Sequence, residues 1–347
     1  MYCTFEHAAL ESVTATVSKE IVPVTKHLEG LASERKALRL QKGTGIESLS
    51  LARPELCTSD LAMESIHRMI ENGAVTREQV GALLFISQTA DYLTPSTSHV
   101  MQGKLGLGGD VIAMDIELGC SGFVYGLYLA AALLPTLAPG KKVLLCGGDT
   151  SSRNADPTET AMRSIAGDAA FAAVIGIPTP RQSSKMYFHI TTDGSKADYL
   201  LVARGGSRAN RLTDTEGQLT TDKGNFVQMN GMGVMDYTLY DVPKNIQELL
   251  SFAKKQPSEV ELAVLHQANQ MTVTTMAEKL GIAKERVPFR AQRYGNTSSA
   301  SIPLCISELS EPLPEHGLLL SGFGVGMSTA SVYMDGMQTN VLKTGTL

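Results

Sequence analysis

The sequence predicts an α/β protein built from two similar halves. Short runs rich in Val, Ile and Leu alternate with segments of helical periodicity, and such continuous apolar runs are typical of strands in sheets that are covered on both faces. The order of strands and helices recurs once, because Gly106 matches Gly281 at an offset of 175 residues and Cys120 matches Asn296 at 176. This offset is close to half of the 347-residue chain. We therefore expect two α/β halves stacked face to face.

Each half is expected to contain an apolar strand, a helix that ends near a Leu-Gly pair, a further apolar segment and a last apolar strand. In the first half these elements are predicted at residues 80–86, from about 96 to 107, 111–116 and 143–148. In the second half they are predicted at residues 260–265, up to 282, 287–289 and 318–323. A helix beginning near Thr58 has its apolar residues at helical spacing and would pack outside the first sheet.

The chain is divided by this pattern into an N-terminal half at residues 1–180 and a C-terminal half at 181–347. The boundary is placed between about 176 and 190, where Pro178 and Pro180 lie in a polar connection. Residues 204–233 are rich in Gly, Asn, Thr and Asp and predict a long irregular excursion from the second half. Long loops of this kind are often functional, and a solvated insertion is the equally good alternative.

Composition excludes several classes of protein. The net charge is −5, from 30 basic and 35 acidic residues, and no basic run is long enough to follow a nucleic acid backbone. The five Cys form no CxxC pair and the seven His show no paired ligand spacing, so we expect no disulfide framework and no metal site. The N-terminus lacks the pattern of a secretory signal. These features indicate a reducing, cytoplasmic compartment.

One uncharged stretch, residues 118–140, is about as long as a membrane-spanning helix. It contains Cys, Ser, Gly and Tyr, and Pro135 shortens its apolar helical part. It is therefore interpreted as a helix buried within the protein, and no membrane span is expected.

Cys120 is a candidate nucleophile because it lies between a predicted strand and a Gly/Ala-rich helix at 121–134. The free N–H groups and the dipole of a helix N-terminus favour a thiolate, so we expect the pKa of this thiol to fall below about 8.5. The alternative is a small buried Cys without a chemical role.

His266 and Asn296 are candidates for the same site. His266 directly follows the strand at 260–265, and open α/β sheets bind ligands beyond the carboxyl ends of their strands. Asn296 leads into a helix of small residues, where a helix N-cap is its alternative role. Because Asn296 is the repeat mate of Cys120, pseudo-twofold packing would bring the two helix starts together, with His266 near a neighbouring strand end.

Five segments together carry a resemblance to a known family. They are Asp-Ile-Glu-Leu-Gly-Cys-Ser-Gly-Phe at 115–123, Gly-Asp at 167–168, His-Gln-Ala-Asn at 266–269, Gly-Asn-Thr-Ser-Ser-Ala-Ser-Ile-Pro at 295–303 and Gly-Phe-Gly-Val-Gly at 322–326. In this order the chain resembles the beta-ketoacyl-acyl carrier protein synthase III family of the thiolase superfamily. The resemblance implies a thiolase-like, duplicated, five-layered α-β-α-β-α fold, a homodimer, and a Cys-His-Asn catalytic set at Cys120, His266 and Asn296.

The resemblance also implies a reaction. Cys120 would take an acyl group from an acyl thioester, and a decarboxylative Claisen condensation with a malonyl thioester on acyl carrier protein would follow. No cofactor is implied, since the substrates are acyl-CoA or acyl-carrier protein and malonyl-carrier protein. Backbone N–H groups of Cys120 and of the Gly324-Val325 loop would stabilise the negative oxygen, and His266 and Asn296 would donate to the enolate.

Several positions depart from the family pattern. Val325 stands where many members have the middle one of three consecutive Gly, which restricts the backbone there. Members that use coenzyme A commonly stack its adenine on a Trp, but this chain has none and offers Arg39 and Lys42 near Thr44, with Asn269 as a further residue for substrate or carrier binding. Two Arg of such members are replaced by Thr160 and Met271. We therefore expect coenzyme A to be a weak donor.

The acyl pocket of this family is partly closed by a loop from the other subunit, here residues 91–95. Thr94 stands where many acetyl-preferring members have Phe, so Thr94 and Leu93 are predicted to line a larger pocket that favours medium or longer acyl chains. In the alternative, Tyr92 or Leu93 refills the space.

Other functions stay open at this stage. The order Cys, His, Asn also occurs in papain-like cysteine hydrolases. An acyltransferase or hydrolase could act on thioesters without condensation, and a non-catalytic ketosynthase-like subunit could dimerise with an active partner. The exact acyl chain length, the physiological donor and the pathway are not predicted.

Overall fold

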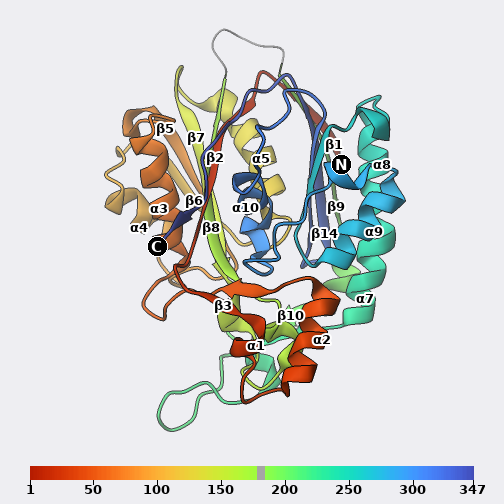
Figure 1. Cartoon of the computed structure of the whole chain (residues 1–347). Coiled ribbons are helices and arrows are strands. Elements are labelled where there is room, and N and C mark those ends of the chain that lie inside the picture. Colours follow the sequence, from red (N-terminus) through yellow and green to blue (C-terminus); the bar gives the residue numbers. More distant parts are fainter. Residues whose placement is uncertain (178–183) are drawn as a thin grey trace.

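The computed structural model describes residues 1–177 and 184–347. Its main body consists of two β-sheets that face each other across two central helices (Figure 1). The first sheet has seven strands in the order β15-β2-β8-β7-β5-β6, with β16 also beside β2. Their bounds are Asn340–Val341, Ala9–Val17, Asp168–Gly176, Lys142–Thr150, Val80–Ile86, Ile112–Ile116 and, for β16, Gly345–Thr346.

The second sheet has five strands in the order β1-β9-β14-β13-β12. Their bounds are Tyr2–Glu6, Lys185–Thr192, Ser328–Asp335, Leu318–Gly324 and Leu262–Leu265. Strand β12 pairs with β13 in parallel, as β5 does with β6 and β7, whereas β14 and β9 are antiparallel to their neighbours. The second sheet ends at β12, because residues 287–289 follow a single helical turn and form no strand.

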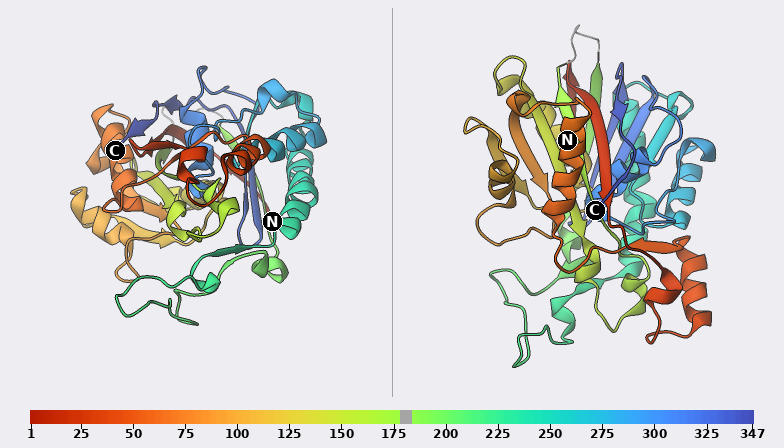
Figure 2. Two further views of the ribbon diagram at one scale, coloured as in Figure 1. Left: turned by 60° about the horizontal axis from the view of Figure 1, so that its bottom comes forward. Right: turned by 60° about the vertical axis from the view of Figure 1, so that its left-hand side comes forward.

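Helices cover both sheets on both faces, which confirms the five-layered α-β-α-β-α fold (Figures 1 and 2). Helices α5 (Gly122–Leu133) and α10 (Ser301–Ser307) lie between the sheets. Helices α3 (Thr58–Glu71) and α4 (Thr97–Lys104) pack outside the first sheet, and α8 (Val242–Phe252) and α9 (Gln270–Leu280) outside the second.

The central layer is held by the apolar runs that the sequence shows. Helix α5 buries both of its faces, with Phe123, Leu127 and Ala130 fully inside, and the Phe123 ring meets Phe171 of β8 edge-on at 5.2 Å between ring centroids. The uncharged stretch at 118–140 is thus an internal helix followed by a short turn at Leu134–Thr136. Within the described residues, no helix is long and apolar enough to cross a membrane.

The two ends of the chain exchange sheets, which the repeat did not predict. Strand β1 pairs with β9 in the second sheet, while β15 and β16 pair with β2 in the first, so the two termini lie on opposite sides of the body (Figure 1). The division of the chain at residue 180 stays a prediction. Pro178 and Pro180, on which it depended, lie outside the described residues.

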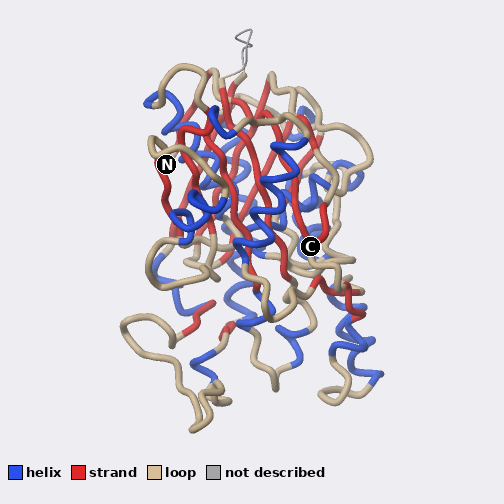
Figure 3. Tube along the Cα trace, turned by 90° about the vertical axis from the view of Figure 1, so that its left-hand side faces the viewer, coloured by secondary structure: helices blue, strands red, loops and turns tan. Residues whose placement is uncertain are grey.

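Smaller elements form the lower end of the molecule, where loops predominate (Figure 3). Strands β3 (Ile21–Pro23) and β4 (Ser48–Ser50) and helices α1 (Val24–His27) and α2 (Glu34–Thr44) surround a small core of their own. Near them lie helix α6 (Thr160–Arg163), the hairpin of β10 (Leu200–Val202) and β11 (Val227–Met229), and helix α7 (Gly231–Asp236).

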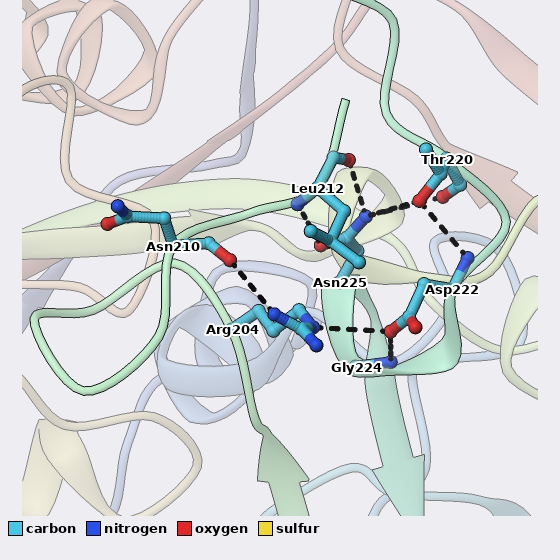
Figure 4. A network of polar contacts seen from close by, with 7 residues as sticks. All are labelled: Arg204, Asn210, Leu212, Thr220, Asp222, Gly224 and Asn225. Carbon is cyan, nitrogen blue, oxygen red and sulfur yellow. Dashed lines mark hydrogen bonds and ion pairs between the residues drawn. The ribbon is translucent and has the colours of Figure 1, made fainter. Parts of the chain in front are cut away.

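The predicted irregular excursion at 204–233 is irregular only in its first part, because it ends in β11 and the start of α7. The irregular part extends away from the body (Figure 2) and is organised by its own polar contacts (Figure 4). The buried Asn225 side chain donates to the carbonyls of Leu212 and Thr220 at 2.8 and 3.3 Å, and its Oδ1 accepts from the Leu212 N–H at 3.0 Å. Asp222 accepts from the Gly224 N–H at 2.8 Å and pairs with Arg204 at 3.4 Å. One buried amide therefore fixes the base of this loop.

The close packing of α5 on the first sheet generates a stability prediction. A Cβ added at Gly126 would meet the side chains of Ile86 and Leu145, the latter at 2.7 Å, so Gly126→Ala should destabilise the protein by about 1–3 kcal/mol in urea unfolding. Gly103 in α4 is the matched control, because a Cβ there has no atom within 4 Å. Gly103→Ala should be neutral or stabilising by up to about 1 kcal/mol, since Ala is the better helix former. Equal effects of the two substitutions would contradict the packing.

Candidate active site

Cys120 lies between β6 and α5, where the two halves of the protein meet. Its Sγ is 3.9 Å from the Ser298 hydroxyl, and the backbone N–H groups of Cys120 and Val325 are close enough to lower the pKa of the thiol. Strand β13 approaches so closely that a Cβ on Gly324 would lie 3.1 Å from the sulfur, and Gly324 has a φ of +153°. Glycine is thus required at 324 for the backbone to reach the thiol.

The expected low pKa of the Cys120 thiol is wrong for this structure. Burial raises the pKa of Cys120 to about 11, and the negative charge of Asp149 acts in the same direction. The hydrogen bonds from Ser298 and the two N–H groups lower it by less than burial raises it. Helix α5 begins at Gly122, so the sulfur lies before the first helical turn, and the helix N-terminus does not offset the loss of water.

His266 directly follows β12, and its N–H donates to the carbonyl of Ser321 at 2.8 Å, which continues the pairing with β13. Its ring is buried, with 3% of the residue exposed, and stands edge-on to Phe323 at 5.5 Å. Burial lowers the pKa of His266 to about 4, so the ring is neutral at neutral pH. Nδ1 lies 2.7 Å from the Ser301 hydroxyl, and when Ser301 donates to it the ring proton resides on Nε2.

Asn296 is held by backbone contacts to the other half. Its N–H donates to the Ile165 carbonyl at 2.7 Å, and its carbonyl accepts from Gly167 at 3.0 Å. Gly295 has a φ of +83°, and a Cβ there would lie 2.7 Å from the Ile165 carbonyl oxygen. The side-chain Oδ1 accepts from the Ser298 N–H at 3.0 Å, which leaves the amide NH2 as the donor side.

Strand β13 lies beside both Cys120 and His266. Its successive residues contact one or the other of them. Ser321 pairs with His266, Gly322 lies against the backbone of Cys120 and Ser121, and Phe323 covers the His266 ring. The contact of Ser298 with the Cys120 sulfur brings the Asn296 loop to the same place. The structure therefore gathers the three predicted residues, and Val325, around the carboxyl end of β13.

The other predicted site residues lie apart from this centre. Leu93 is 96% exposed and Thr94 is exposed as well, so in the single chain their loop lines no closed pocket. Asn269 is the N-cap of α9, where Oδ1 accepts from Thr272 at 2.8 Å. Lys42 lines an open cleft of about 480 Å³, whereas Arg39 is exposed on the same helix and does not line it. The cleft is lined by Leu38, Gln41, Lys42, Gly45, Glu47, Gln270 and Gln292.

Three residues of the site were not singled out from the sequence. Ser298 and Ser301 lie within the Gly-Asn-Thr-Ser-Ser-Ala-Ser segment, but their hydroxyls carried no signal of contact with Cys120 or His266. Asp149, at the end of β7, is a polar residue closing an apolar run, a placement that could have drawn attention. Among the described residues, no group of three potential metal ligands is present.

Comparison with known proteins identifies the family. A two-sheet fold with a cysteine at the start of the central helix defines a thiolase-fold protein. Residues 114–194 match the family model of 3-oxoacyl-[acyl-carrier-protein] synthase III, and 250–335 match its C-terminal model. The chain is 32% identical to a beta-ketoacyl-[acyl-carrier-protein] synthase III of Rhodopirellula baltica, over 82% of this chain and 86% of that protein. The chain therefore belongs to the beta-ketoacyl-[acyl-carrier-protein] synthase III family.

Solved structures agree with this assignment. A 3-oxoacyl-(acyl-carrier protein) synthase from Burkholderia xenovorans superimposes with a TM-score of 0.90 at 29% identity, covering 100% of this chain and 99% of that one. The synthase III of Thermus thermophilus gives a TM-score of 0.82 at 29% identity over 94% and 98%. The priming beta-ketosynthase of the R1128 polyketide pathway shares the fold, with a TM-score of 0.81 at 22% identity over 96% and 98%.

The raised thiol pKa predicts slow alkylation of the resting protein. At pH 8 the thiolate fraction is about one quarter for a free thiol of pKa 8.5 but only about one thousandth at a pKa of about 11. Iodoacetamide should therefore modify Cys120 on the order of a hundredfold more slowly than glutathione, with a rate that keeps rising up to about pH 11. Mass spectrometry of the peptide containing Cys120 measures this rate. Alkylation as fast as glutathione's at pH 7–8 would contradict the structure.

Proposed function

We propose that the protein condenses an acyl thioester with a malonyl thioester carried on acyl carrier protein, through an acyl-enzyme on Cys120. The observation that carries the proposal is the convergence of a thiol, a neutral imidazole and a fixed amide around the end of β13. Membership of the synthase III family, with its place in fatty acid biosynthesis, supports it.

In the first half-reaction, Cys120 attacks the carbonyl carbon of the acyl thioester. The new bond joins the sulfur to the acyl carbon, the old thioester bond breaks, and the thiol proton ends on the departing thiol. The N–H groups of Cys120 and Val325, which lower the pKa of the thiol in the free protein, would stabilise the intermediate oxyanion. Because the thiol is neutral at rest, deprotonation and attack are expected to be coupled.

In the second half-reaction, the malonyl thioester loses CO2 and its enolate attacks the acyl carbon, which releases the Cys120 sulfur. The enolate oxygen needs donors that are already oriented. A neutral His266 with its proton on Nε2, and the Asn296 NH2 group, supply them. Because the pKa of His266 is about 4, the imidazole is already neutral at neutral pH. It can donate its one N–H without first losing the proton of an imidazolium.

This division of labour is tested by three variants. Cys120→Ala should abolish acyl-enzyme formation, measured by intact-protein mass spectrometry with a panel of acyl thioesters, which also identifies the donor. His266→Ala and Asn296→Ala should still acylate but lose malonyl decarboxylation by about 10²–10³-fold, the effect of one oxyanion donor. Condensation at the wild-type rate in either variant would contradict the enolate role. Acyl-enzyme without condensation in the wild-type protein would favour a simple thioester acyltransferase or hydrolase.

We propose a carrier-bound acyl group, rather than coenzyme A, as the better donor. Thr160 begins α6 and is buried, and Met271 on α9 is 55% exposed, so neither supplies positive charge for the phosphates of coenzyme A. Glu278 further along α9 adds a negative charge to this helix and pairs with Lys284 at 2.8 Å.

We further propose a homodimer that pairs β6 with its copy. Strand β6 is the edge strand of the first sheet, and its Ile112 and Met114 are 40% and 39% exposed. An unpaired apolar edge is a ready template for another strand. Analytical ultracentrifugation at micromolar concentration should show a dimer, and Met114→Asp should shift it toward monomer. A wild-type monomer would contradict the proposal.

The exposed loop at 91–95 would then reach the partner and close its acyl pocket. With Thr94 in place of a ring, each methylene that enters contributes about 0.8 kcal/mol, so longer acyl groups should outcompete acetyl. Thr94→Phe should shorten the preferred chain in a competition assay of acyl thioesters of different lengths. An unchanged chain-length profile in Thr94→Phe would show that this residue does not set the depth of the pocket.

A further inference from the structure

Asp149 is a buried carboxylate that connects the two halves of the protein beside the proposed nucleophile. It is the next-to-last residue of β7 and is 1% exposed. Its Oδ1 accepts from the Gln88 N–H at 2.7 Å and from the Ser87 hydroxyl at 3.3 Å. Its Oδ2 accepts from the N–H of Ser299 at 3.2 Å and from the Ser299 hydroxyl at 2.7 Å.

The Asp149 carboxyl group is satisfied by hydrogen bonds rather than by a cation, and burial raises its pKa more than these hydrogen bonds lower it. Within residues 1–177 and 184–347, no Lys, Arg or His forms an ion pair with it. A buried carboxylate is costly unless its oxygens are well satisfied, and here each oxygen accepts from one backbone N–H and one hydroxyl. This arrangement requires two acceptor oxygens, which an amide in the same place cannot supply.

Each carboxyl oxygen of Asp149 binds a residue that adjoins the site, Gln88 on one side and Ser299 on the other. Gln88 fills the space where a Cβ of Gly119 would lie, directly before Cys120. Ser299 follows Ser298, whose N–H holds the Asn296 amide oxygen and whose hydroxyl reaches the Cys120 sulfur. Ser298 has a φ of +51°, a strained conformation for a residue with a side chain, so it depends on its surroundings to be held there.

We propose that Asp149 is a positioning residue that orients the Asn296 amide for decarboxylation by fixing Ser299 against the Cys120 segment. The inference rests on the proposed function and adds a residue to it. Asp149 touches neither substrate nor the reacting atoms in this assignment. It acts through Ser299 and Ser298 on Asn296.

The first test compares Asp149→Asn with a matched substitution, Asp168→Asn. Asp168 is equally buried at the start of β8, but its carboxylate binds Ser152 and Ala52 within the N-terminal half. Asp149→Asn should lower malonyl decarboxylation at least tenfold while self-acylation stays within threefold. Asp168→Asn should leave the ratio of the two rates unchanged. Equal losses of both rates in Asp149→Asn would overturn the proposal, because a purely structural role predicts that result.

A second readout does not depend on the reaction. Burial lowers the pKa of His266 to about 4, so the ring is neutral at pH 8, and the Asp149 carboxyl group raises the pKa of the Cys120 thiol. Replacing that carboxyl group by an amide should make iodoacetamide alkylation of Cys120 at pH 8 severalfold faster. Asp168→Asn should not change this rate. An unchanged rate in Asp149→Asn would count against the assignment even if the protein proved to have no condensing activity.

A milder variant keeps the proposal testable if Asp149→Asn does not fold. Ser299→Ala removes one of the two hydrogen bonds on the C-terminal side but keeps the charge of Asp149. Decarboxylation should fall severalfold, while self-acylation stays within threefold. A crystal structure of either variant should show the Asn296 amide displaced from the Ser298 N–H. Retention of that 3.0 Å contact in both variants would overturn the proposal.

Discussion

The close approach of β13 to the Cys120 segment is the constraint on which the rest of the structure depends. A Cβ at Gly322 would lie 2.7 Å from the Cys120 carbonyl oxygen, and one at Gly324 would lie 2.9 Å from the Cys120 Cβ. Two glycines therefore let the strand of one half touch the helix start of the other. The same approach brings the Val325 N–H near enough to the sulfur to lower the pKa of the thiol, and leaves Cys120 half-buried.

Exclusion of water explains why the thiol and the imidazole both titrate far from their usual range. Burial disfavours the charged form of each group, so it raises the pKa of Cys120 to about 11 and lowers that of His266 to about 4. The two groups are thus neutral together over the physiological range, and a resting thiolate-imidazolium pair, as in papain-like hydrolases, does not form. An enzyme that must exclude water from a carbanion gains from such a dry site, because donors fixed in advance act more strongly there.

Much of the fold and the position of the site could be predicted from the sequence, because the apolar runs of the chain show the repeat. The parallel strands β5, β6, β7, β12 and β13 and the central helices follow directly from those runs, and the pairing of Cys120 with Asn296 placed the site at the interface. The terminal strands could not be assigned in this way. Strand β1 alternates exposed and half-buried residues, and β15 and β16 have two residues each. Their sequences therefore do not indicate which sheet they join.

The wrong prediction of a low pKa for the Cys120 thiol shows what local sequence patterns cannot predict. A cysteine before a helix suggests an activated thiol, but that inference considers only the chain on either side of Cys120. The larger effects come from residues about 30 to 200 positions away, namely the glycines of β13, the hydroxyl of Ser298 and the charge of Asp149. Ser301 has a comparable effect on His266, because its hydroxyl binds Nδ1 of the ring from a helix 35 residues further along the chain. The residue types of the site are thus readable in the sequence, whereas their protonation states are set by tertiary packing.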